Sequence, residues 1–341
     1  MAALTSSNLT LADWAKRTDP NGDIPVIANI LSQTNEILKD AVFKMGNLPT
    51  GHRVVITTGL PTVTWRSLNQ GIAPSKATTA QVDEGVGMLE ARAEVDKDLA
   101  MLNGNTSAFR LSEARMFLEA MNQEVAETYI TGNPGTIPEQ FLGFEPRYND
   151  LGAGNAQNII DGDGVGADNT SILLVVWGDE TVFSIFPKGS TAGLQHRDLG
   201  EQTVYEAGGA GLRMQAFVDW FQFKVGLVVK DWRYVVRIAN IDVSDLGTLT
   251  AAQAPTVFTN IIHDMTQAIA RIPNISRGRP VFYMNRTVFT GLMRLGLEKS
   301  NNAVTVEPAL SQFGTIANMM SFLGVPVRRV DAITNTEARV V

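Results

Sequence analysis

Three histidines, His52, His196 and His263, are the first side chains to consider for catalysis or metal binding. Imidazole can transfer protons near neutral pH and can bind zinc, but both roles need partner groups at defined spacings. None of the three lies in an HExxH motif or has a carboxylate at a helical offset. The sequence therefore favours a surface or structural role for each. It also lacks the GxSxG nucleophile motif and the GxxxxGK(S/T) phosphate loop.

A glycine-rich loop offers two further possibilities. Gly162, Gly164 and Ala167 formally match the dinucleotide fingerprint GxGxxA. The motif precedes the predicted strand ILLVVW instead of following a strand and opening a helix, so no helix N-terminus is available for a pyrophosphate. Aspartates in the same loop could suggest calcium, but the spacing and terminal glutamate of an EF-hand are absent. We predict a polar loop, with no cofactor and no metal ion.

The composition excludes several classes of function. The chain has 341 residues, a formal net charge of -7 and no cysteine. A sequence-independent DNA-binding protein needs clustered Lys and Arg for phosphate contacts, and no such cluster is present. The absence of cysteine excludes disulfides, thiolate catalysis and Cys-ligated metals. With no signal-peptide pattern and no apolar window of about 18 residues, we expect a soluble protein made in the cytosol.

The N-terminal third contains two contrasting periodicities. Residues 9–44 are predicted to be largely helical, and their apolar stripe needs either the chain's own domain or a neighbour to cover it. From 47 to 102 the period changes to two. The predicted strands there are HRVVITTG, PTVTWRSL, KATTAQVD and GMLEARAEVD. Because hairpins of this kind bury little on their own, this segment is typical of a long projecting β-loop.

A long helix follows, and its end is sharply marked. Ala114, Phe117, Met121 and Val125 recur at helical spacing, which predicts a helix over residues 107–131. Such a helix would be about 37 Å long at 1.5 Å per residue. The sequence TGNPG then supplies a glycine and a proline that end it.

The remainder predicts a mixed α+β body. Residues 171–243 indicate a meander of antiparallel strands, and residues 255–272 indicate a helix. After these we predict a buried strand in PVFYMN, a helix in RTVFTGLMRLGL, another helix near residues 312–322 and a last strand in GVPVRRVDAI.

In chain order, the predicted elements are an arm, a projecting β-hairpin segment, a long helix closed by glycine and proline, and an α+β body. This series resembles the major capsid proteins of tailed bacteriophages, the Hong Kong 97 fold, and in particular those of short-tailed phages (podoviruses). The stretches that carry the resemblance are NLPTGHR, TGLPTVTWR, LNGNTSAFRLSE, FLEAMNQE, PEQFLGFEPRY, WGDETVFSIFPKGSTAGL, RPVFYMNRTVF and SFLGVPVRRVD.

The resemblance implies an α+β, Hong Kong 97-like fold with four parts. They are an N-terminal arm (1–46), an extended β-loop (47–102), a peripheral domain (103–250) with a spine helix (107–131) and a β-sheet (171–240), and an axial domain with the C-terminal strand (251–341). In the usual family order a comparable sheet follows the axial domain, so this chain would have a reordered topology. A structure that places residues 171–240 inside the axial domain would contradict that hypothesis.

The resemblance also implies a structural, non-enzymatic function. Many copies would form the hexamers and pentamers of an icosahedral phage head, made in the host bacterial cytoplasm and enclosing double-stranded DNA without sequence-specific binding. Portal, scaffold and decoration proteins would be further partners, and a membrane would not. Trp65 and Arg66 in the extended loop are the residues expected to contact a neighbouring subunit. The alternative for Trp65 is packing within its own hairpin.

Two other functions remain open from the sequence. One is a non-viral, encapsulin-like shell that encloses protein cargo and uses the same fold. The other, of a different class, is an α+β enzyme with a site assembled from Asp161, Asp163 and His196.

Overall fold

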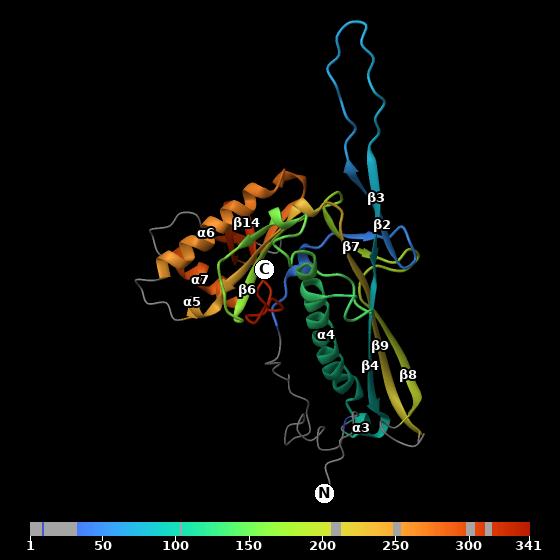
Figure 1. Ribbon diagram of the computed structural model, residues 1–341. Helices are drawn as coiled ribbons and strands as arrows, with labels where there is room; N and C mark the ends of the chain where they lie inside the picture. Colours follow the sequence, from blue (N-terminus) through green and yellow to red (C-terminus); the bar gives the residue numbers. More distant parts are fainter. Residues whose placement is uncertain are drawn as a thin grey trace. The chain divides into compact units, whose positions relative to one another are not determined.

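The structure of the protein is a computed structural model (Figure 1). The residues it describes are Leu9 and the ranges 33–102, 104–205, 213–247, 254–297, 304–310 and 316–341. Most of the predicted N-terminal helix lies outside these residues. Among residues 33–44, only α2 (Ile37–Asp40) is helical. Strand β1 (Phe43–Met45) follows it, so the prediction of a helix up to residue 44 is wrong at its C-terminal end.

The chain divides into two compact units. The first comprises residues 1–33, 88–125 and 191–224, and the second comprises residues 34–87, 126–190 and 225–341. Two elements, α4 (Thr106–Thr131) and β9 (Arg213–Val229), begin in the first unit and end in the second. The boundaries expected from the sequence, at 102 and 250, do not coincide with these units.

The second unit is built on a mixed sheet. Its strands include β5 (Ile159–Asp161), β6 (Asn169–Trp177), β7 (Val182–Phe186), β10 (Val235–Asp242), β11 (Arg279–Met284), β12 (Val304–Leu310), β13 (Ile316–Phe322) and β14 (Val325–Arg329). Strand β6 is central, antiparallel to both β10 and β11, and every one of its residues is buried. This burial explains its near-continuous apolar sequence. Strand β11 pairs in parallel with β14, which pairs antiparallel with β13.

Two amphipathic helices cover this sheet. Helices α6 (Ala254–Arg271) and α7 (Arg286–Leu297) lie alongside strands β6 and β14 in Figure 1. Met265 of α6 and Val288 of α7 are fully buried in one core with Leu174 of β6 and Phe282 of β11. The shorter helical elements are α5 (Val243–Gly247) and the 3-10 turns Glu145–Arg147, Ala156–Asn158, Trp232–Tyr234 and Ile275–Arg277. No helix within the described ranges is long and apolar enough to cross a bilayer.

This arrangement corrects three expectations. Residues 171–240 do not form a separate meander, because β6 and β10 share a sheet with β11 and a core with α6 and α7. Strand β7 is joined to β6 by a single parallel residue pair. The hypothesis of a reordered sheet beside the long helix is therefore wrong for β6 and β10. The predicted helix near residues 312–322 is strand β13. Leu323 and Gly324 have φ values of 48° and 81°, so they form the tight left-handed turn that joins β13 to β14.

Helix α4 confirms the predicted long helix, and its end is fixed by close backbone approach. The Gly132 amide donates to the Thr128 carbonyl at 3.0 Å, and the Gly143 amide donates to the Gly132 carbonyl at 2.7 Å. The chain thus returns against the end of the helix. Beside it, the Tyr129 and Ser184 hydroxyls are hydrogen-bonded at 2.6 Å in the core of the second unit.

The first unit contains the N-terminal part of α4 and a second group of strands. Strand β4 (Gly87–Asp96) leads into α3 (Lys97–Met101), and β8 (Gln195–Tyr205) pairs antiparallel with β9. Ala93, Met121 and Phe221 form its small core. Arg110 of α4 donates to Asp219 of β9 at 2.9 Å, which fixes the helix on the strands.

Candidate intersubunit surface

The most exposed apolar surface of the described chain lies on the β2–β3 extension, which we define as residues 51–85. Strands β2 (Gly51–Gly59) and β3 (Thr78–Gly85) pair antiparallel along most of their length. Arg53 and Asp83 face each other across the pair, with Arg53 Nε 2.6 Å from Asp83 Oδ1. The hydrogen bond from Arg53 holds the pKa of the Asp83 carboxyl below its usual value.

The predicted strand PTVTWRSL is not formed. Residues 60–77 have no regular secondary structure apart from a turn at residues 68–69. Pro61 cannot donate a backbone hydrogen bond, and side chains in this segment have no half-buried sheet surface to pack on. The predicted strands HRVVITTG and KATTAQVD are confirmed as β2 and β3, whereas the predicted strand between them is wrong, and β2 pairs directly with β3.

The tip of the extension carries several large apolar side chains in contact with solvent. Leu60, Val63 and Leu68 are 86%, 89% and 92% exposed, and Trp65 is 101% exposed. So many exposed large apolar side chains within nine residues are typical of a site of association. Full exposure also excludes packing of Trp65 within its own hairpin, which was the alternative from the sequence.

Hydrogen bonds local to the tip shape it. Arg66 Nη1 donates to the Gln70 carbonyl at 3.3 Å, and Ser75 Oγ donates to the Thr62 carbonyl at 2.8 Å. These bonds tie side chains to backbone within the tip and leave the Trp65 indole pointing away from its own chain, as its exposure shows.

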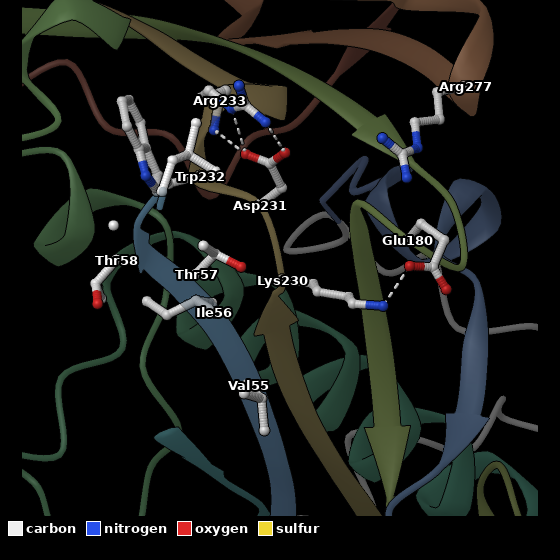
Figure 2. Close-up of a pocket in the computed structure, with 12 residues that line it drawn as sticks. Val55, Ile56, Thr57, Thr58, Glu180, Lys230, Asp231, Trp232, Arg233 and Arg277 are labelled. Carbon is white, nitrogen blue, oxygen red and sulfur yellow. Dashed lines mark hydrogen bonds and ion pairs between the residues drawn. The ribbon is translucent and has the colours of Figure 1, made fainter. Parts of the chain in front are cut away.

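A cleft of about 610 Å³ lies beside β2 in the second unit (Figure 2). It is lined by residues 55–60, Glu180, residues 230–233 and Arg277. Lys230 is hydrogen-bonded to Glu180, and this bond lowers the pKa of the Glu180 carboxyl. Arg233 Nη2 lies 2.8 Å from Asp231 Oδ2, and dashed lines mark the interaction between these two side chains in Figure 2. None of these lining residues is a histidine or cysteine, and both carboxylates, those of Glu180 and Asp231, are paired with cations.

Two of the three histidines, His52 and His196, pack against aromatic rings, and the third lies on the surface. The His52 ring meets the Phe183 ring edge-on at 5.4 Å, and burial lowers the pKa of this histidine. The His196 ring stacks on Phe221 at 4.8 Å, and its Nε2 lies 3.0 Å from Asp219 Oδ1. His263 is exposed on α6.

The glycine-rich loop packs on β10. The Gly162 and Gly164 amides donate to the Ala239 and Asn240 carbonyls, each at 2.8 Å, and Asn240 Nδ2 donates to Asp161 Oδ1 at 2.9 Å. The loop leads into β6 and not into a helix, which removes the context of a dinucleotide site. Across the described residues, no group of three His, Cys, Asp or Glu side chains could hold a metal ion.

Two buried ionic groups were missed from the sequence. Glu84, near the end of strand β3, is buried and bound by Arg147. Arg237 lies between the carboxylates of Glu145 and Glu337. The partners are separated by 63 to 100 positions along the chain, so no local pattern could reveal them.

Comparisons with known proteins agree with the fold. A family model described as "Major capsid protein GP7" matches residues 19–341. In the structure of bacteriophage Epsilon15, a similar chain has 31% identity and a TM-score of 0.74, and the match covers 100% of this chain and 99% of that chain. The capsid of bacteriophage JBD30 matches at 11% identity over 97% and 96% of the two chains, with a TM-score of 0.47. No curated protein sequence matches significantly.

An encapsulin complex from Synechococcus elongatus matches at 11% identity over 68% of this chain and 96% of that chain, with a TM-score of 0.45. The projecting extension, the long helix and the full-length match to the Epsilon15 chain together define a Hong Kong 97-like phage capsid protein. The chain belongs to the major capsid protein GP7 family.

Proposed function

We propose that this chain is the shell subunit of a phage head and that it assembles into hexamers and pentamers around double-stranded DNA. The observation that carries the proposal is the match of the whole chain to one in bacteriophage Epsilon15, at 31% identity. The exposed apolar tip of the β2–β3 extension supports it, because repeated heterologous contacts between identical chains build closed shells.

The parts of the chain receive roles on this basis. Residues 1–46 serve as the arm, residues 47–102 as the extended loop and helix 107–131 as the spine of the peripheral domain, which we place within residues 103–250. The axial domain comprises residues 251–341 together with β5, β6 and β10, since these strands share its sheet.

Trp65 and Arg66 contact the neighbouring subunit in this proposal. An indole and a guanidinium are the side chains most often found at the energetic centre of protein interfaces, because each combines a large contact area with a directed polar group. The tip presents both next to one another, together with exposed Leu68. Burial of this surface on a second copy would remove apolar side chains from water.

In this proposal, the assembled shell holds its DNA by confinement and not by sequence-specific contacts. A formal net charge of -7 disfavours tight binding of a polyanion. The protein has no enzymatic role in this proposal. Its other partners are portal, scaffold and decoration proteins, and its synthesis takes place in the host cytoplasm.

The direct test is expression of the full chain followed by size-exclusion chromatography and negative-stain microscopy. Uniform shells or capsomers are expected. Single globules at high protein concentration would refute self-assembly. Particles isolated from phage should release nuclease-protected double-stranded DNA, whereas enclosed protein without DNA would favour the encapsulin-like alternative.

A further inference from the structure

The last residues of the chain form a strap, which we define as residues 331–341, across the second unit. The Glu337 amide donates to the Asn169 carbonyl at 2.9 Å. The Val340 amide donates to Asn240 Oδ1 at 2.8 Å, and Asn240 Nδ2 donates back to the Val340 carbonyl at 2.9 Å. The strap is thus tied to strands β6 and β10.

A buried cluster of charged side chains lies under the strap. Arg237 Nη2 is 2.8 Å from Glu337 Oε2 and 3.1 Å from Glu145 Oε1. The exposed fractions of the three side chains are 4% for Arg237, 5% for Glu337 and 18% for Glu145. Ser171 Oγ also donates to Glu337 Oε2, at 2.6 Å. Glu337 is the member contributed by the strap, so the cluster joins the strap to the body of the unit.

The charges in this cluster do not balance when both carboxyls are ionised. One guanidinium then faces two carboxylates, which leaves a net negative charge in a site from which water is largely excluded, and this is unfavourable. In addition, Glu337 Oε1 is buried and accepts no hydrogen bond from any described residue. A proton on Glu145 would correct both defects, because it neutralises one charge and can be donated to the neighbouring carboxylate.

We propose that the strap is a proton-operated latch, in which a proton on Glu145, donated to Glu337, holds residues 331–341 in place and its loss loosens them. The inference rests on this cluster within a single chain and does not depend on the proposed assembly. Its chemistry is a proton equilibrium only, and no covalent bond to a heavy atom forms or breaks.

The direction of the pH dependence follows from the surroundings. Burial raises the pKa of Glu145 to about 8, the charge of Glu337 raises it too, and Arg237 acts in the opposite sense. A hydrogen bond between the two carboxyl groups raises the pKa of Glu145 as well. The adjacent cation, Arg147, is engaged by Glu84 and does not neutralise the pair.

Because this pKa lies above the value of 4.5 expected when the strap is open, closure is most favoured below about pH 4.5. The stabilisation is lost progressively as the pH rises to about 8 and is constant above that value. One proton can change the opening equilibrium by at most about tenfold per pH unit.

Hydrogen exchange of the full chain at a series of pH values tests the latch. Exchange in peptides that cover residues 331–341 is corrected at each pH with an unstructured reference peptide. Wild-type protection should fall by up to about tenfold per pH unit from about pH 5 to pH 8 and then level off. Glu145→Gln replaces the protonated carboxyl by an amide, which can still donate a hydrogen bond and cannot ionise, so protection should become nearly independent of pH.

Glu337→Gln is a second variant that removes the charged carboxylate acceptor on the strap, and it should also flatten the profile if Glu145→Gln fails to fold. Glu127→Gln, on an exposed residue of α4, is the matched control and should retain the wild-type slope. An unchanged slope in both cluster variants, or a lost slope in the control, would overturn the latch. So would an equal pH slope in peptides of β8, since the loosening would then be global.

Discussion

Arg147 and Glu84 form a buried, bidentate ion pair that ties the β2–β3 extension to the segment after α4. Arg147 Nη1 and Nη2 lie 2.7 Å from Glu84 Oε1 and Oε2, and the side chains are 13% and 7% exposed. Arg147 Nη2 also donates to the Leu142 carbonyl at 3.2 Å. The base of the extension is therefore held by a paired charge, whereas the hydrogen bonds described above for its tip are local to the tip.

We expect Arg147→Ala to destabilise the protein by about 3–5 kcal/mol, because it leaves the Glu84 carboxylate buried without a partner. The matched control is Arg53→Ala, which removes an exposed pair with Asp83 from the same extension and should have little effect on the free energy of unfolding, because water screens exposed charges. Urea denaturation of both variants measures the difference. Equal losses would show that the buried pair has no special role, and the double variant Arg147→Met, Glu84→Leu should recover part of the stability.

Trp65→Ala separates assembly from folding. Since Trp65 is fully exposed in the single chain, its removal should change the free energy of unfolding by no more than about 0.5 kcal/mol. Loss of an interface anchor, in contrast, weakens association by about 2 kcal/mol or more at each contact, and the effect is repeated around a shell.

Light scattering and negative-stain microscopy should therefore show loss of particles while the denaturation midpoint is unchanged. Val165→Ala provides the control, because Val165 is a 72% exposed apolar residue in a different loop. Normal particles with Trp65→Ala would exclude Trp65 as a contact.

Gly132→Ala and Gly143→Ala test the turn after α4. A Cβ atom on Gly132 would lie 2.6 Å from the Phe141 carbonyl oxygen, and one on Gly143 would lie 2.7 Å from the Thr128 carbonyl oxygen. Backbone must shift to relieve either clash, so we expect each variant to be destabilised by about 1–3 kcal/mol.

The control is Gly154→Ala, since a Cβ atom there would meet no atom within 4 Å. Thermal denaturation compares the three variants. Wild-type stability of Gly132→Ala and Gly143→Ala would show that the chain does not return against the helix end as described.

Asp264→Asn should stabilise the protein above about pH 6. Burial and the nearby charges of Asp163 and Asp161 raise the pKa of Asp264 to about 6, against the opposing effect of His263 and Arg271. Because the folded value exceeds the ordinary 3.8, the favourable contribution is complete below pH 3.8 and is lost as the pH rises through 6. Asparagine avoids that loss. Urea midpoints should differ at about pH 7.5 and converge toward about pH 4, and a difference that grows at low pH would contradict the assignment.

Local sequence is enough to locate most of the helices and strands. Helix α4 follows from apolar residues at a spacing of three and four, and its end follows from Gly132 and Pro134. Helix α7 and strand β6 are equally clear. The stretches that resemble phage capsid proteins also indicate the family, because they extend over most of the chain.

Strand pairing and the partners of buried charges, in contrast, depend on the folded chain. The residues near 316–322 form a strand because β14 offers a partner across the turn at Leu323, whereas residues 61–68 have strand-like composition and no paired strand. Sheet pairing depends on neighbours that are distant in sequence, so local periodicity cannot assign it. The same holds for Arg237, Glu145 and Glu337, whose shared burial and ion pairing arise only when folding brings them together.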